Sequence, residues 1–73
     1  METDQWGRRI RAFRKLKGYT QEGLARQLGV SISVLGEVER GSRPLSDELL
    51  KEIANILDVS IDELSPIDKT VER

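Results

Sequence analysis

The chain has 73 residues, 34% of them charged, and a formal net charge of −1 at neutral pH. This length predicts one domain, near the size at which a single hydrophobic core is only just sufficient. The sequence contains no cysteine and no histidine, which excludes disulfide bonds, thiolate chemistry and the usual zinc sites, so helix packing alone must hold the fold.

A first helix is predicted over Asp4–Lys17, with Thr3 as its N-cap and Gly18 as its stop. Its apolar residues recur every three or four positions and predict the face that packs on the core: Trp6, Ile10, Phe13 and Leu16. We interpret Trp6 as a core residue and not as a platform for base stacking. The basic residues between them are interpreted either as a solvated face or as contacts to a polyanion.

Two short helices joined by a tight turn are predicted between Thr20 and Gly41. Thr20 caps the first of them and Gly29 ends it in a left-handed conformation, while Ser31 caps the second. Their apolar stripes are predicted to be Leu24, Ala25 and Leu28 in the first helix and Leu35 and Val38 in the second. Because both helices and the turn are short, the two must cross at a steep angle, which is the helix-turn-helix arrangement.

Two further helices complete the chain. The fourth is predicted over Asp47–Leu57 with Ser46 as its N-cap, and the short last helix over Ile61–Leu64 begins with a capping box of Ser60 and Glu63. No segment has the alternating pattern of a strand. The sequence therefore predicts an all-α fold of five helices.

Charge is distributed unevenly along the chain. Residues 1–20 carry six basic and two acidic residues, whereas residues 44–73 carry three basic and eight acidic ones. Only the basic end is expected to approach a polyanion. No apolar run approaches the roughly 20 residues that span a membrane, and no signal peptide is recognisable. We therefore expect a cytoplasmic protein without membrane contact.

Several motifs in their order along the chain identify a family. They are Leu-Ala-x-x-Leu-Gly-Val-Ser at 24–31, Glu-Arg-Gly at 39–41, Leu-Lys-Glu-Ile-Ala-Asn-Ile-Leu-Asp-Val at 50–59 and Ile-Asp-Glu-Leu at 61–64. Over roughly residues 5–65 the chain resembles the Cro/phage-repressor (XRE-type) helix-turn-helix family. The resemblance implies a compact five-helix domain like that of the lambda repressor.

The domain is expected at residues 1–66, with the helix-turn-helix at about 20–41 and a short tail at 67–73. The resemblance also implies the function: a sequence-specific transcriptional regulator, of the repressor or controller type, that binds double-stranded DNA. Such a protein binds an inverted-repeat operator as a homodimer, with the third helix in the major groove.

Residue roles follow from the same resemblance. The recognition helix begins at Ser31, and its base-reading residues are expected to be Ile32, Ser33 and Glu37. Ile32 suits thymine methyl groups, and Glu37 can accept a hydrogen bond from cytosine N4. Its outward face is expected to comprise Ile32, Ser33, Gly36, Glu37 and Arg40.

Contacts to the DNA backbone are implied at Gln21, Arg40, Arg43 and Lys17. Gln21 is the family's phosphate-contacting glutamine, which is also able to support the recognition helix. The resemblance further implies an inward-facing acid, Glu39, paired with Arg14 of the first helix.

Two points stay open at the level of sequence. The acidic Glu37 departs from the family pattern and, with the acidic C-terminal half, leaves the alternative of a module that binds a partner protein. A patch of Leu64, Ile67 and Val71 would suit dimerisation, or would be a capping contact and a disordered end. No enzymatic activity, cofactor or metal is expected, because the chain lacks a catalytic histidine or cysteine and a phosphate-binding loop.

Overall fold

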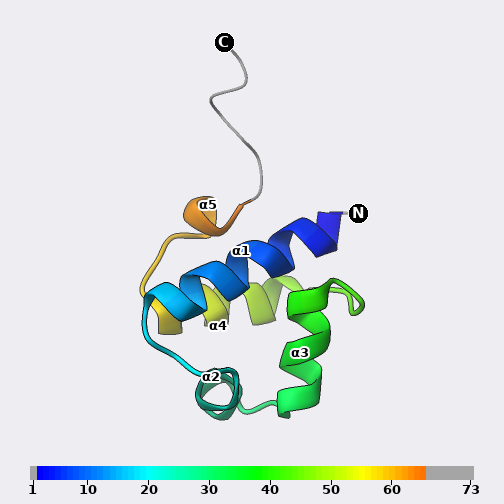
Figure 1. The fold of residues 1–73 in the computed structure, drawn as a ribbon. Coiled ribbons are helices and arrows are strands. Elements are labelled where there is room, and N and C mark those ends of the chain that lie inside the picture. The colour runs from blue at the N-terminus through cyan, green and yellow to red at the C-terminus, as the bar shows by residue number, and fades with distance from the viewer. Residues whose placement is uncertain (1, 66–73) are drawn as a thin grey trace.

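The computed structural model describes residues 2–65 of the 73-residue chain. Its helices, shown in Figure 1, are α1 (Glu2–Leu16), α2 (Gln21–Leu28), α3 (Ile32–Arg40), α4 (Asp47–Leu57) and α5 (Ile61–Leu64). The described residues contain no strand, and the predicted all-α fold of five helices is confirmed. None of the helices in residues 2–65 combines the length and the apolar character that a membrane span needs.

Local capping contacts determine where most of the helices begin and end. The hydroxyl of each predicted N-cap accepts a hydrogen bond from a main-chain amide of the first turn, at Thr20, Ser31, Ser46 and Ser60. Gly29 and Gly41 end α2 and α3 with φ angles of 75° and 79°, in the left-handed region that glycine enters without steric cost. The predicted bounds of α4 and α5 are confirmed, as is the capping box of Ser60 with Glu63.

The first helix begins earlier than predicted. The pattern predicts a start at Asp4 after an N-cap at Thr3, whereas α1 already begins at Glu2. The predicted cap is therefore wrong. Amides in the first turn of a helix have no partner within it and can be satisfied by water in place of a side-chain cap, and carboxylates in the first turn suit the positive end of the helix dipole. The sequence has acidic residues at positions 2 and 4, a composition that favours a helix start before the predicted cap.

Leu16 was predicted to face the core, but 73% of its surface is exposed. Between residues 5 and 16 of α1, the buried residues are Gly7, Ile10 and Arg14, which are spaced three and four positions apart. Leu16 lies two positions beyond Arg14, about 200° around the helix. It therefore points away from the face that packs on the rest of the domain.

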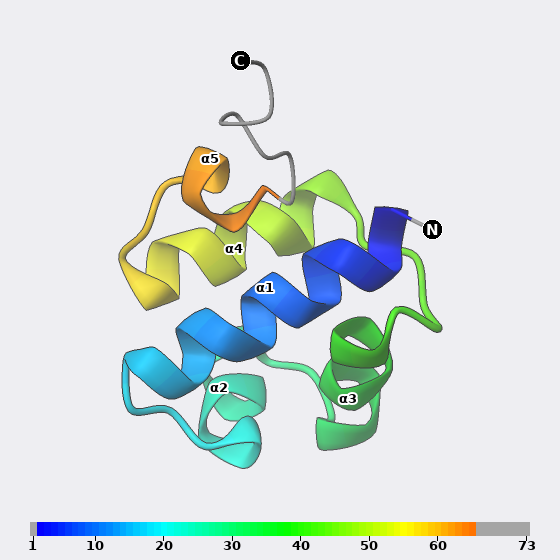
Figure 2. The same ribbon diagram turned by 45° about the horizontal axis from the view of Figure 1, so that its top comes forward.

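The hydrophobic core lies where the helices meet. Its fully buried side chains are Ile10, Leu24, Leu35, Val38, Ile53, Leu57 and Leu64. Partly buried apolar side chains surround them, among them Trp6, Phe13 and Tyr19. Figure 2 shows α1 with α2 and α3 on one side and α4 and α5 on the other, and α1 has its broadest contact with α3. The core therefore supports α3 from behind and leaves its other face open.

The two helices of the helix-turn-helix cross steeply, as predicted. In Figure 1, α2 is seen end-on while α3 runs down the picture. The turn between them is short because Gly29 ends α2 and Ser31 already caps α3.

Leu64 does not contribute to an apolar surface patch. It is completely buried, at 0% exposure, and belongs to the core contact that was the alternative interpretation. The prediction that places Leu64 in a dimerisation patch is therefore wrong, because α5 uses this side chain to close the core. Ile67 and Val71, the other two members of the predicted patch, lie outside the described residues.

Candidate nucleic-acid interface

The first turn of α3 is open to solvent. Ser31, Ile32 and Ser33 are all exposed, and 47% of the Ile32 surface is accessible. Further along the helix, Leu35 and Val38 are each 1% exposed and fix α3 on the core. Two of the residues predicted to contact bases, Ile32 and Ser33, are therefore accessible to a ligand on a helix that is anchored from behind.

Gly36 was predicted on the outward face of α3, but it is buried. A Cβ atom placed on Gly36 would lie 3.3 Å from Arg40 Nη1 and 3.7 Å from Gln21 Nε2. The ends of these two side chains therefore cover the backbone of α3 at this position. Helical periodicity does not reveal this burial, because it depends on how far two long polar side chains reach.

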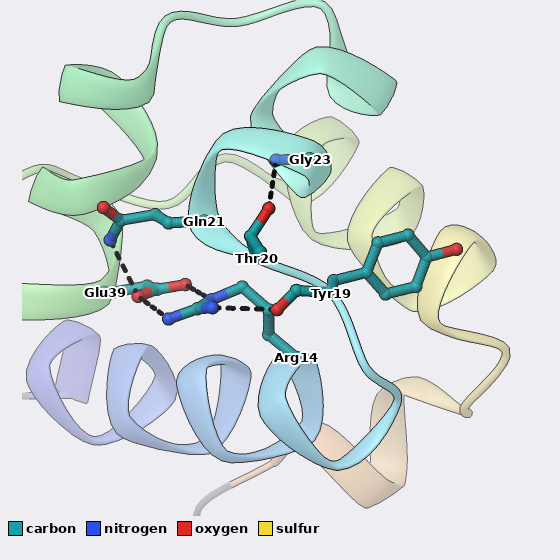
Figure 3. Close-up of polar contacts among 6 residues, drawn as sticks. All are labelled: Arg14, Tyr19, Thr20, Gln21, Gly23 and Glu39. Carbon is teal, nitrogen blue, oxygen red and sulfur yellow. Dashed lines mark hydrogen bonds and ion pairs between the residues drawn. The ribbon is translucent and has the colours of Figure 1, made fainter.

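A buried polar network joins the first three helices (Figure 3). Arg14 Nε on α1 donates to Glu39 Oε2 on α3 at 2.7 Å, and Arg14 Nη2 donates to Glu39 Oε1 at 3.3 Å. Gln21 Nε2, at the start of α2, donates to the same Oε1 at 3.1 Å, and Arg14 Nη1 donates to the Tyr19 carbonyl at 3.0 Å. The structure thus brings together the predicted pair and adds Gln21 to it.

Every buried polar side-chain atom of the network has a hydrogen-bond partner. Arg14 is 7% exposed and Glu39 is 6% exposed, so an unpaired charge at either position would be costly. Among the described residues, no buried side-chain nitrogen or oxygen lacks a hydrogen-bond partner. The network therefore fixes the end of α3 and the start of α2 relative to α1.

Glycine allows α1 and α3 to touch backbone to backbone. A Cβ atom on Gly7 would overlap with the main-chain carbonyl oxygens of Val38 and Glu39. Only a residue without a side chain fits there, so Gly7 places the C-terminal half of α3 close against α1. The periodicity of apolar residues misses Gly7, although a glycine inside a helical pattern is a signal of close packing.

Glu37 and Arg43, predicted to contact a base and the DNA backbone, are bonded to each other. Arg43 Nε donates to Glu37 Oε1 at 2.8 Å, and the two side chains are 46% and 38% exposed. The pair lies on the solvent side of α3 and of the turn that follows it. The sequence places both residues near DNA but does not reveal that they meet.

A shallow hollow of about 310 Å³ opens between the first three helices. Its lining consists of Arg11, Arg14, Gln21, Gly36, Glu39 and Arg40. Since Arg14 is paired with Glu39, the exposed cations at its rim are Arg11 and Arg40. Arg11 is one of the basic residues of the first helix that the sequence leaves as either a solvated residue or a polyanion contact. Its position three residues before Arg14 is the signal that places it on this side of α1. Lys17 is exposed just after α1 but does not line the hollow.

A model of the helix-turn-helix family HTH_3 matches residues 10–64. The chain belongs to this XRE-type helix-turn-helix family. The match covers α2 to α5 completely and α1 from Ile10 onward, so it includes Arg14 and the exposed face of α3.

Among relatives, the chain is 59% identical over 69 residues to the uncharacterized HTH-type transcriptional regulator YazB of Bacillus subtilis, covering 94% of this chain and 100% of YazB. The restriction-modification controller protein C.AhdI from Aeromonas hydrophila superposes with a TM-score of 0.81 at 38% identity, over 86% of this chain and 91% of C.AhdI. The biofilm regulator SinR, solved in complex with DNA, gives a TM-score of 0.72 at 39% identity, over 80% of this chain and 97% of that structure. Against the full SinR of Bacillus subtilis, the chain spans 50% of its length.

Proposed function

We propose that the chain is a DNA-binding transcriptional regulator that inserts α3 into the major groove of double-stranded DNA. The observation that carries the proposal is the exposed first turn of α3. Leu35 and Val38 anchor this helix in the core, and the network of Arg14, Glu39 and Gln21 fixes its far end. An α-helix fits the major groove, and the start of such a helix reaches the base edges. The similarity to transcriptional regulators, one of them bound to DNA, supports the same function.

The first turn of α3 contacts bases in this proposal. Ile32 packs its exposed side chain on thymine methyl groups, and the Ser33 hydroxyl donates to or accepts from several bases. Ile32 therefore contributes a preference for thymine, while Ser33 is permissive. Both side chains lie on a helix whose orientation the core determines, which is the condition for a fixed reading register.

In this proposal, residues around the first turn of α3 contact the DNA backbone. Gln21 is the first residue of α2, where free main-chain amides and the positive end of the helix dipole favour a phosphate. The hollow beside it is rimmed by Arg40 and Arg11, which adds positive charge at the same place. Lys17 follows α1 and contributes charge farther from the hollow.

The protein binds its operator as a symmetric homodimer in this proposal. Two copies of α3 about 34 Å apart match successive turns of the major groove on one side of the duplex. An inverted-repeat operator mirrors this two-fold symmetry. The contact between protomers does not involve Leu64, because that side chain is used in the core.

The alternative of a protein-interaction module loses its main support. It was favoured by the acidic Glu37 on the face of α3, which would repel phosphates. The Arg43 guanidinium lies against that carboxylate at 2.8 Å and offsets its charge.

The proposal is tested by selecting bound duplexes from a random pool with the purified protein. We expect an inverted repeat, with affinity in the nanomolar range typical of specific sites. Ile32→Ala should weaken binding about tenfold at sites with the contacted thymine, and replacing that thymine with uracil should weaken the wild type but not the variant. Lys51→Ala, an exposed change on α4, is the matched control and should bind like the wild type. If no duplex is retained even at low salt, the proposed function is wrong.

A further inference from the structure

The ion pair of Glu37 and Arg43 has unused hydrogen-bonding groups on the solvent side. The contact uses Arg43 Nε and Glu37 Oε1. Among residues 5–65, whose side chains the structure describes, the two Nη groups of Arg43 and Oε2 of Glu37 have no hydrogen-bond partner. Side by side, the pair therefore presents one strong acceptor next to two donors.

The pair lies on the part of α3 that is proposed to meet the bases. Glu37 is four residues after Ser33, so the two side chains are neighbours on the same face of the helix, one turn apart. Both members are partly exposed, at 38% and 46%. A duplex that receives the first turn of α3 in its major groove therefore also meets this pair.

A carboxylate alone is an ambiguous reader of DNA. It accepts equally from the amino group of cytosine (N4) and from that of adenine (N6). What differs is the neighbouring atoms: a C·G pair offers, across the groove, the N4 donor followed by the O6 and N7 acceptors of guanine. An acceptor beside two donors complements this order, and it does not complement the acceptor–donor–acceptor order of an A·T pair.

We propose that Glu37 and Arg43 read a C·G base pair as one unit. Glu37 accepts from cytosine N4, while Arg43 donates through its two Nη groups to guanine O6 and N7. Arg43 thereby becomes a base reader in place of the predicted backbone contact, and its pairing with Glu37 orients the guanidinium before DNA arrives. The proposal rests on the proposed function, since it assigns base specificity to the same face of α3.

The test uses the duplex selected by the wild type and measures dissociation constants by fluorescence anisotropy. The C·G pair that depends on Glu37 is first located with Glu37→Gln, which should lower the preference for it about tenfold. Arg43→Lys retains the charge but loses the fork of two donors, and it should lower the preference at the same base pair by a similar factor. The double variant should lose little more than either single one, because the two residues act together.

A base analogue probes Arg43 directly. Replacing the guanine of this pair with 7-deazaguanine removes N7, one of the two acceptors proposed for Arg43. The change should weaken binding of the wild type about fivefold and leave binding of Arg43→Ala unchanged. Glu52→Gln and Lys51→Ala, exposed on α4, are controls of matching charge and should respond like the wild type.

Three results would overturn the inference while leaving the proposed function intact. The selected site could lack a preferred C·G pair at any position affected by Glu37→Gln. The Arg43→Lys variant could retain full preference, as a simple phosphate contact would. Arg43→Ala could weaken all duplexes equally with a shallower salt dependence. Failure of the wild type to select any duplex would instead overturn both the inference and the proposed function.

Discussion

The position of α3 depends most on two buried charged residues, Arg14 and Glu39. Arg14 and Glu39 are 7% and 6% exposed and contact each other at 2.7 Å. Removing one partner leaves the other charge buried, which costs about 3–5 kcal/mol. We therefore expect Glu39→Gln to lower the free energy of unfolding by about 3 kcal/mol, as measured by urea denaturation. This is a large part of the stability of a domain of this size.

Two further variants distinguish the effect of the buried charges on stability from their effect on the orientation of Gln21. Glu22→Gln breaks the exposed pair with Arg26, whose side chains are more than 70% accessible, and should cost less than about 1 kcal/mol. Replacing both Arg14 and Glu39 with Met and Leu removes the buried charges together and should recover most of the lost stability. DNA binding should stay weakened in that double variant, since Gln21 loses the carboxylate that orients it. Full recovery of binding would show that the network has only a structural role.

At the scale of the helices, replacing the buried glycines of α1 and α3 with alanine should change the stability in opposite directions. Gly7→Ala would push a methyl group into the main-chain carbonyls of Val38 and Glu39, and forced overpacking of this kind costs about 1–3 kcal/mol. Gly36→Ala meets only the flexible ends of Arg40 and Gln21, and alanine is better than glycine inside a helix by about 1 kcal/mol.

We therefore expect Gly7→Ala to lower the melting temperature and Gly36→Ala to leave it unchanged or to raise it. Thermal unfolding followed by circular dichroism measures both. Gly36→Ala should nevertheless weaken DNA binding in the proposed function, because the methyl group displaces Arg40 at the rim of the hollow. Equal melting temperatures for the two variants would contradict the close packing of α1 on α3.

The elements that were predicted correctly are those with local causes. Thr20, Ser31 and Gly29 act on amides and carbonyls within a few residues, so the sequence around them is sufficient to place them. The burial of Gly36 and the exposure of Leu16 depend on packing between helices, which periodicity alone does not describe.

The contacts of the candidate site also differ in how far the sequence predicts them. The pairing of Arg14 with Glu39, 25 positions apart, was available only through the family resemblance. The contact of Glu37 with Arg43 depends on how the turn after α3 folds back. Neither the helical pattern nor the family motif encodes that contact.

At the scale of the whole molecule, charge is arranged by face. The exposed cations Arg11, Arg40 and Lys17 lie on the part of the domain formed by α1 and α3. The helices α4 and α5 lie on the other side of α1 in Figure 2. They carry the exposed acids Asp47, Glu48, Glu52, Asp62 and Glu63. The net charge of −1 therefore does not oppose DNA binding through α3, since charges beyond a Debye length of about 8 Å are largely screened at physiological salt.

This arrangement predicts how steeply DNA binding depends on salt. Each phosphate neutralised by a cation adds about 0.9 to the slope of log K against log salt concentration. If Arg40 and Lys17 of each protomer contact phosphates, a dimer neutralises four, and the expected slope is about −3.6. Gln21 contributes nothing to it because its side chain is neutral. Arg43 contributes nothing either, because Glu37 already offsets its charge.

The slope is measured by titrating the selected operator between about 50 and 200 mM salt, the range over which phosphate contacts change affinity strongly. Arg40→Ala in both protomers should reduce it by about 1.8, and Lys51→Ala on the acidic side should leave it unchanged. A wild-type slope of about −5.4 that Arg43→Ala reduces by about 1.8 would mean that Arg43 releases Glu37 and contacts a phosphate in each protomer. A slope near zero would contradict docking through the basic side of the molecule, whatever bases α3 contacts.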